Sequence, residues 1–156
     1  MGPAAFRFQP SSDDAVEGAA FSPVFRLLAS AIVGGCMLGL AQLWSMGALG
    51  TARTSGVGWF VAGLAMMAWT WLAILRSRTR IDGEGLYQRW VWDKRMAYDD
   101  LAYGKLIRVR GLDWLIAPRL YVRTLMGKFA VFYGATPELI AEFERLVAEL
   151  RAFRKL

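Results

Sequence analysis

Charged side chains that could bind a ligand or take part in catalysis are concentrated in one segment, RSRTRIDGEGLYQRWVWDKR. This segment spans residues 76–95 and directly follows a long apolar run. Asp82 and Glu84, separated by one glycine, could form an acid/base pair or bind a metal ion. An exposed hairpin turn accounts for the same residues, because Asp and Gly are favoured where the backbone turns sharply. Asp99 and Asp100 stand in a similar position at the end of a predicted strand. A turn is the favoured interpretation for both pairs.

The composition of the chain argues against an enzyme. The sequence contains no histidine and a single cysteine, Cys36, which lies within the apolar run. Without histidine the commonest general base is absent, and so is the base of a Ser-His-Asp or Cys-His arrangement. One cysteine leaves few ligands for zinc and cannot form an intramolecular disulfide. We therefore predict no catalytic residues, no metal site and no cofactor, and the sequence identifies no small-molecule substrate.

Basic side chains dominate the same segment and suggest an anionic partner. An anionic membrane surface attracts each nearby Lys or Arg by about 1 kcal/mol, and salt weakens this attraction. The same charges would also set membrane orientation, and the sequence leaves open whether they do more. Nucleic acid is not expected as a partner, because a small core better explains the aromatic residues between the charges. The candidate residues for contact with lipid headgroups are Arg76, Arg78, Arg80, Arg89, Lys94 and Arg95.

Two long uncharged stretches precede this segment. Residues 27–52 and 54–75 contain no Asp, Glu, Lys or Arg. A helix as long as the second stretch reaches about 33 Å, enough for a hydrocarbon core of about 30 Å. We predict a transmembrane hairpin over residues 23–76, with spans at about 25–49 and 56–76. Two buried helices of a soluble bundle are the less favoured alternative, because two such stretches follow in succession.

The distribution of charge predicts the orientation of the hairpin. The formal charge of +6 comes entirely from residues 76–156, because basic and acidic groups balance in residues 1–75. Three arginines directly follow the second span, whereas only Arg53 lies in the connection between the spans. By the positive-inside rule, residues 77–156 form a cytoplasmic domain, and two spans place the N-terminus there too. Residues 1–22 are polar and are expected to form a flexible cytoplasmic segment.

Small side chains recur at every fourth position of the first span, at Ala31, Gly35 and Gly39. Such a stripe lets another helix approach closely. The approaching helix is either the second span of the same chain or belongs to another molecule, a second copy or a larger complex. No charged residue lies inside either span, so no ion path or proton relay is indicated.

The C-terminal part has the pattern of a small antiparallel β domain closed by a helix. Short segments separated by Gly, Asp or Pro predict strands from residue 78 onward, with DGEG as the first turn and residues 86–92 in the second strand. From Thr136 onward, apolar residues recur at helical spacing with charged residues opposite. This pattern predicts an amphipathic helix that packs on the sheet.

One connection between the predicted strands, GLDWLIAP at residues 111–118, is more apolar than loops usually are. Trp114, Leu115 and Ile116 provide its apolar side chains. They either contact the membrane interface or a partner protein, or they cover one end of the sheet.

Several short antiparallel strands followed by one closing helix resemble a pleckstrin-homology-like (PH-like) fold. The segments RIDGEGLYQRW, MAYDDLAYGKLIRVRG and RLYVRTLMGKFAVFYG, with the final helix, are similar to bacterial PH domains that are attached to membrane hairpins. The resemblance covers residues 78–153. It implies a binding or scaffolding module without catalytic residues, and it does not carry over the phosphoinositide specificity of eukaryotic PH domains.

The sequence therefore predicts an α+β membrane protein of the bacterial inner membrane. A two-span transmembrane helical hairpin is followed by a small antiparallel PH-like sheet or barrel, closed by a C-terminal amphipathic helix. Our first hypothesis is a membrane-anchored module that binds a protein partner or an anionic lipid surface. The alternative is an accessory or assembly subunit that docks into a larger inner-membrane complex through its first transmembrane helix. The expected partners are membrane lipids and either another protein or a second copy of the chain.

Overall fold

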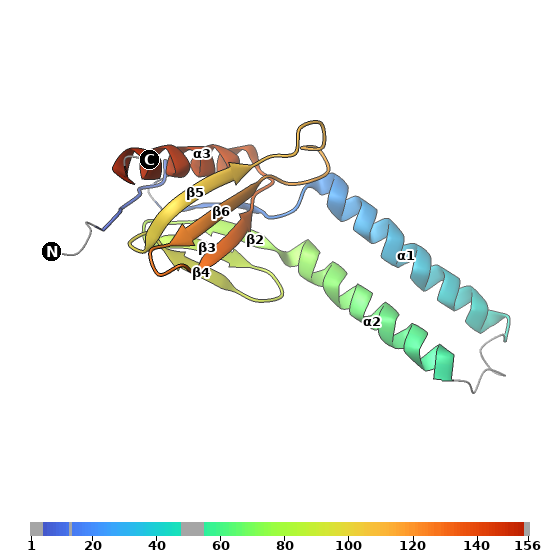
Figure 1. Ribbon diagram of the computed structural model, residues 1–156. Helices are drawn as coiled ribbons and strands as arrows, with labels where there is room; N and C mark the ends of the chain where they lie inside the picture. Colours follow the sequence, from blue (N-terminus) through green and yellow to red (C-terminus); the bar gives the residue numbers. More distant parts are fainter. Residues whose placement is uncertain (1–4, 13, 48–54, 155–156) are drawn as a thin grey trace.

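Two long helices project together from one end of a small domain, as Figure 1 shows. The computed structural model describes residues 5–12, 14–47 and 55–154. The long helices are α1 (Pro23–Ser45) and α2 (Ser55–Arg76), and the domain contains two antiparallel sheets and the C-terminal helix α3 (Pro137–Arg154). This arrangement confirms the predicted order of two long apolar helices, antiparallel sheets and a closing helix.

Local signals set the ends of α1. Ser22 caps its start, where the side-chain Oγ accepts a hydrogen bond from the backbone N–H of Phe25 at 3.2 Å, and Pro23 occupies the first turn. The helix ends at Ser45, and Gly47 adopts a φ of 70°. Glycine tolerates this left-handed conformation, which stops a helix. The first helix therefore ends before the predicted limit at residue 49.

Both long helices have the length and composition needed to cross a membrane. Only 6% of the residues in the most apolar window of each helix are buried within the protein, so most side chains of these windows are at least partly exposed. Between the helices, Trp71 Nε1 donates a hydrogen bond to Ser30 Oγ at 2.8 Å. Arg26 donates from Nη2 to the carbonyl of Leu75 at 3.0 Å, which satisfies one of the free carbonyls at the end of α2.

The strands of the domain form a four-stranded and a three-stranded antiparallel sheet. The first sheet has the order β1-β2-β3-β4, with β1 (Val16–Ala19), β2 (Arg78–Ile81), β3 (Gly85–Arg89) and β4 (Lys94–Ala97). The second sheet has the order β5-β6-β7, with β5 (Leu101–Ile107), β6 (Arg119–Thr124) and β7 (Phe129–Tyr133).

The described residues before α1, 5–12 and 14–22, are part of the domain, which differs from the flexible segment expected over residues 1–22. β1 precedes α1 and pairs with β2, which follows α2, so that Val16 lies opposite Ile81. Phe6 and Phe8 are 3% and 1% exposed and belong to the core. The physical reason is that α1 and α2 begin and end beside each other, which brings the chain before one helix next to the chain after the other. The whole helical hairpin is thus inserted between two neighbouring strands.

The second strand of the C-terminal part is shorter than predicted. β3 ends at Arg89, and residues 90–92 form the turn that leads into β4. Trp90 and Trp92, which the sequence placed in this strand, are therefore turn residues. Within β3 the alternation is regular, because Leu86 and Gln88 are buried while Arg89 is exposed. The DGEG segment forms the predicted turn: Asp82 Oδ1 accepts hydrogen bonds from the backbone N–H groups of Glu84 and Gly85, both at 3.0 Å.

The core lies between the two sheets and α3, and it includes aromatic residues from both ends of the chain. The apolar stripe of α3 packs inward as predicted, with Phe143, Leu146 and Leu150 buried. Tyr98 contacts the rings of Phe6 and Phe8 edge-on. Its hydroxyl donates a hydrogen bond to the backbone carbonyl of Asp82 at 2.8 Å. Burial raises the pKa of Tyr98 above its usual value, and the charges of Asp82 and Glu142 add to this shift.

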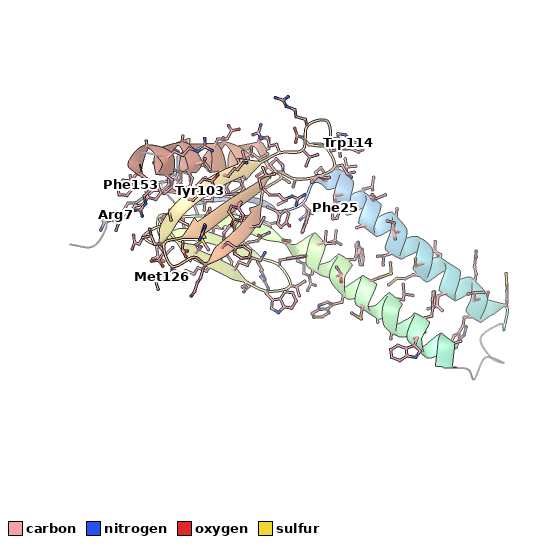
Figure 2. The ribbon with its side chains drawn as sticks, viewed as in Figure 1. Arg7, Phe25, Tyr103, Trp114, Met126 and Phe153 are labelled. Atoms are coloured by element: carbon pink, nitrogen blue, oxygen red, sulfur yellow. The ribbon has the colours of Figure 1, made fainter. Side chains whose placement is uncertain are left out.

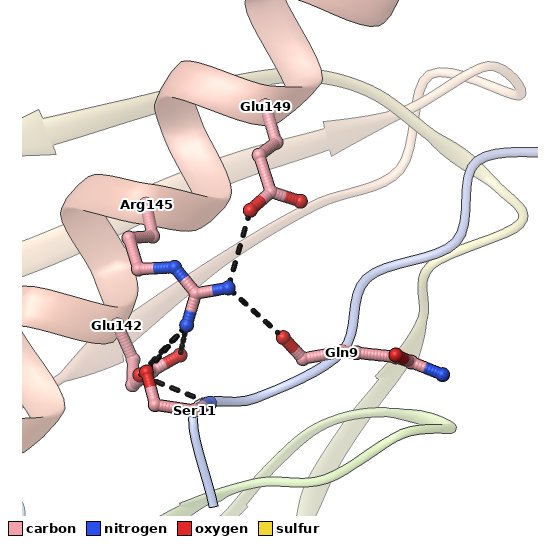
Figure 3. A network of polar contacts seen from close by, with 5 residues as sticks. All are labelled: Gln9, Ser11, Glu142, Arg145 and Glu149. Carbon is pink, nitrogen blue, oxygen red and sulfur yellow. Dashed lines mark hydrogen bonds and ion pairs between the residues drawn. The ribbon is translucent and has the colours of Figure 1, made fainter.

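A polar network joins the N-terminal segment to α3 (Figure 3). The carboxylate of Glu142 is almost fully buried and pairs with Arg145 Nη1 at 3.1 Å. It also accepts hydrogen bonds from Ser11, through the backbone N–H at 3.2 Å and through the hydroxyl. Arg145 in turn donates to the carbonyl of Gln9 at 3.2 Å and pairs with Glu149 at 3.3 Å. The network therefore links two segments that are more than 130 residues apart in the chain.

Gln88 is expected to reduce the stability of the domain. Its side chain is fully buried, and neither amide atom has a hydrogen-bond partner among the described residues. Burying an unsatisfied amide costs about 1–3 kcal/mol. Gln88→Met keeps the shape of the side chain and removes the polar atoms, so it should raise the free energy of unfolding by about that amount. Denaturant unfolding of the full chain in detergent measures the change, and an equal or lower stability would contradict the prediction.

Candidate functional site

A groove of about 870 Å³ lies on the outer face of the first sheet, beside the end of α2. Alternation along the strands produces it, because inward side chains such as Thr79 and Gln88 enter the core while their neighbours point outward. Five arginines and three carboxylates line it and give it a formal charge of +2. The arginines are Arg76, Arg78, Arg80, Arg89 and Arg95, and the carboxylates are Glu17, Asp82 and Glu84. We refer to this site as the arginine groove.

Five of the six basic residues predicted to contact headgroups thus come together. Lys94 does not join them, although it neighbours Arg95 in the sequence. Adjacent residues of a strand point to opposite faces, and Lys94 Nζ lies 5.6 Å from the ring centroid of Trp90 and 3.4 Å from the carbonyl of Val131. Its charge is directed toward the second sheet.

Three of the groove arginines have carboxylate partners. The pairs are Arg78–Glu17 at 3.3 Å, Arg80–Asp82 at 3.4 Å and Arg95–Glu84 at 2.6 Å. All six side chains are partly or largely exposed, so each pair contributes little to stability.

Arg76 and Arg89 have no ion pair with any described residue, and both line the groove. Arg89 lies directly opposite Arg78 across the β2–β3 pair. Like charges in directly opposed positions of a sheet repel each other, and an anion between them would remove that repulsion. The guanidinium group binds phosphate and carboxylate through two parallel hydrogen bonds. Arg76 and Arg89 therefore offer two guanidinium groups without carboxylate partners among the described residues, a chemistry suited to an anion.

An apolar slot of about 220 Å³ adjoins the groove. Arg76 and Arg89 line both the slot and the groove and so form a boundary that the two share. The other walls of the slot come from one face of α2 and from the β3–β4 turn. These residues are Trp69, Leu72, Ala73, Trp90 and Val91. The sequence did not predict the slot, because Trp90 and Val91 were assigned to a strand and not to a turn beside α2.

The β3–β4 turn also carries Trp92, whose side chain is largely exposed. Across the turn, the hydroxyl of Tyr87 donates a hydrogen bond to Asp93 at 2.9 Å. This hydrogen bond raises the pKa of Tyr87, and partial desolvation adds to the shift. The protonated phenol therefore helps to hold the turn in place.

The β5–β6 connection lies at the start of α1, where Figure 2 labels Trp114 and Phe25 close to the same end of the domain. Ser22 Oγ donates a hydrogen bond to the carbonyl of Leu115 at 2.7 Å, which holds the connection against the helix cap. Trp114 is exposed, whereas Leu115 and Ile116 are half-buried. Trp114 therefore does not cover the core, and its side chain is available at the end of the domain from which the helices project.

The stripe of Ala31, Gly35 and Gly39 does not face α2. A side-chain Cβ added at Gly35 or Gly39 would meet no atom within 4 Å among the described residues. The residues that contact α2 lie on the other side of α1, where Arg26 and Ser30 hydrogen-bond to it. The stripe therefore does not pack against the second helix of the same chain, which was one of the two alternatives for the helix that approaches it.

No group of three or more His, Cys, Asp or Glu side chains in the described ranges could hold a metal ion. Comparisons of the chain with models of protein families, with curated proteins and with solved structures find no match. The absence of catalytic activity stays a prediction from the composition. The chemistry that the arginine groove offers is the binding of an anion next to an apolar chain.

Proposed function

We propose that α1 and α2 span the bacterial inner membrane, that the domain is cytoplasmic, and that the arginine groove binds the phosphate group of an anionic membrane lipid. One observation carries the proposal: Arg76 and Arg89 lack carboxylate partners within the described residues and line a groove where α2 leaves the domain. Lipid phosphates lie just outside the hydrocarbon core, at the level where a transmembrane helix ends.

The adjoining slot supports a lipid over a soluble anion. Its walls are the apolar face of α2 and the turn residues Trp90 and Val91, with Arg76 and Arg89 at the boundary with the groove. A phospholipid has the same order of groups, an apolar chain next to a charged phosphate. The phosphate would lie between the two arginines, and the first part of an acyl chain would lie in the slot beside α2.

Two exposed tryptophans support the placement of the domain at the membrane surface. Trp92 lies in the β3–β4 turn beside α2, and Trp114 lies in the connection beside the start of α1. Tryptophan is enriched at the membrane–water interface, because its ring is apolar and its N–H is polar. One tryptophan beside each helix would keep the groove directed toward the headgroups.

We also propose that the domain is PH-like. Two antiparallel sheets of four and three strands followed by a closing helix are consistent with that interpretation. The helical hairpin then interrupts the fold after its first strand. Binding through the groove on the outer sheet face does not require a catalytic residue.

Arg76→Gln with Arg89→Gln is expected to weaken the binding of anionic lipid about 30-fold. This value assumes about 1 kcal/mol for each arginine. The full chain in uncharged detergent is titrated with dihexanoylphosphatidylglycerol and, separately, with the zwitterionic dihexanoylphosphatidylcholine, while tryptophan fluorescence is followed. Glycerol 3-phosphate serves as the soluble anion without acyl chains.

The matched control is Arg123→Gln with Arg151→Gln, which removes the same charge from exposed positions outside the groove. This control should bind the anionic lipid like the wild-type protein. Equal affinity of the wild type for the two lipids, or equal losses in the two double variants, would contradict the proposal. Tighter binding of glycerol 3-phosphate than of the lipid would show that the ligand of the groove is a soluble phosphate and not a lipid.

A second candidate function is docking into a larger membrane complex through α1. The observation that favours it is the open stripe at Gly35 and Gly39, which faces away from α2. Gly35→Leu with Gly39→Leu should leave the domain folded and abolish co-purification of the partner or of a second copy, because the larger side chains hold another helix away. Gly63→Leu on α2, where the added atoms also meet nothing within 4 Å, is the control. Co-purification that survives the double substitution would contradict this candidate.

A further inference from the structure

Exposed apolar side chains gather at the end of the domain opposite the long helices. Met126 is 84% exposed and Phe129 is 69% exposed, and Leu125 and Tyr103 are exposed beside them. Figure 2 labels Tyr103 and Met126 far from the end where the helices begin. A hollow of about 530 Å³ lies between β5 and β6 in the same region. We call this surface the distal face and define it by Tyr103, Tyr121, Arg123, Leu125, Met126 and Phe129.

Neither the core nor a membrane explains the distal face. Its side chains point outward from the second sheet, because their neighbours Leu120, Val122 and Phe132 fill the core. A bilayer around α1 and α2 would lie at the opposite end of the domain. A contiguous exposed apolar surface on a soluble domain marks an interaction site.

Basic side chains predominate around the distal face, although Asp99 and Asp100 are exposed at its edge, where the carbonyl of Asp100 accepts a hydrogen bond from the backbone N–H of Leu125. β5, β6 and β7 contain no Asp or Glu, and Lys105, Arg123 and Lys128 are exposed on or beside the face. None of these three forms an ion pair with a described residue. The strand register places Arg123 opposite both Tyr103 and Phe129, so a positive charge stands between two aromatic rings. A complementary ligand therefore carries carboxylates next to apolar groups.

The apolar groups favour a protein over a nucleic acid. Single-stranded nucleic acid needs free ring faces on which bases can stack. Tyr121 and Phe129 stack on each other, with ring centroids 6.2 Å apart and an angle of 24° between the planes, so each ring has only one face left for a base. The most exposed neighbours, Leu125 and Met126, are aliphatic, and methionine adapts well to protein side chains.

We propose that the distal face binds an acidic amphipathic segment of a partner protein, with its apolar side chains against Phe129 and Met126 and its carboxylates against Arg123. This inference is independent of lipid binding, because the arginine groove is lined by the first sheet and α2. Lipid and partner could bind at the same time. The domain would then connect the membrane to a protein in the cytoplasm.

The test uses two synthetic fluorescent peptides of 20 residues with Leu and Phe at helical spacing, one with Glu and the other with Lys at every remaining position. Their binding to the full chain in uncharged detergent is measured by fluorescence anisotropy. The acidic peptide should bind more tightly than the basic one, and added salt should weaken it. Arg123→Glu, Phe129→Ser and Met126→Ser should each weaken its binding roughly tenfold.

Arg151→Glu is the matched control, because it makes the same charge change at an exposed position of α3. It should bind the acidic peptide within about twofold of the wild type, since its charge lies outside the face. Met126 lies in an exposed turn, so Met126→Ser tests the face without disturbing the core. Equal binding of the two peptides, no binding of either, or equal losses in Arg151→Glu and Arg123→Glu would overturn the proposal. A thymidine oligonucleotide of 20 residues is tested in the same way. If it binds and Phe129→Ser abolishes that binding, the proposed protein partner is wrong and nucleic acid is the ligand of the distal face.

Discussion

Residues 77–156 expressed alone are expected to remain unfolded. Without the preceding segment, β2 loses β1 as its partner, and the core loses Phe6 and Phe8. Removing a buried phenylalanine side chain costs about 3–5 kcal/mol, and two such losses are comparable with the total stability of about 5–15 kcal/mol that is typical of a domain. Far-UV circular dichroism and thermal unfolding measure the result. Cooperative unfolding of this fragment would show that the N-terminal segment is dispensable.

A protein that keeps the N-terminal segment but lacks the helical hairpin is expected to fold as a soluble domain. The backbone N–H of Ala20 donates a hydrogen bond to the carbonyl of Ser77 at 3.3 Å, so these residues are already neighbours. Joining residue 20 to residue 77 through Asn-Gly should turn β1 and β2 into an ordinary β-hairpin, because Asn-Gly favours a two-residue turn. This protein should fold in the absence of detergent. Phe8→Ala in it should lower the free energy of unfolding by about 3–5 kcal/mol.

Arg145→Met is expected to destabilise the full chain by about 3 kcal/mol. The substitution leaves the buried carboxylate of Glu142 without its cationic partner, and a buried charge whose partner is removed typically costs 3–5 kcal/mol. The lower end of this range applies because Glu142 retains its hydrogen bonds from Ser11. Arg145 also lies over the ring of Phe8, at 5.2 Å from its centroid. Denaturant unfolding of the full chain in detergent measures the loss.

Two further variants separate the buried charge from the loss of packing. Adding Glu142→Gln to Arg145→Met removes the unpaired charge and should recover part of the stability. Arg151→Met, at an exposed position of the same helix, should change the stability by less than about 0.5 kcal/mol. A loss in Arg151→Met equal to that in Arg145→Met would contradict a specific role for the network shown in Figure 3.

Local patterns in the sequence were sufficient for the helices and for the identity of the basic residues that line the arginine groove. The long uncharged stretches determine α1 and α2, and helical spacing of apolar residues determines α3. Arg78 and Arg80 are two residues apart, which places both on one face of a strand. Such features depend on neighbours a few residues away, so they can be read directly along the chain.

Tertiary structure alone decided where these elements meet. β1 pairs with β2 across the whole helical hairpin, and Phe8 reaches a core formed mainly by residues after position 80. The rotation of α1 decided that Gly35 and Gly39 face away from α2. The end of β3 at Arg89 decided that Trp90 borders the slot beside α2. These observations share one physical reason. Burial and strand pairing act between segments that come together from distant parts of the chain. Local spacing carries no information about which distant surface a residue will contact.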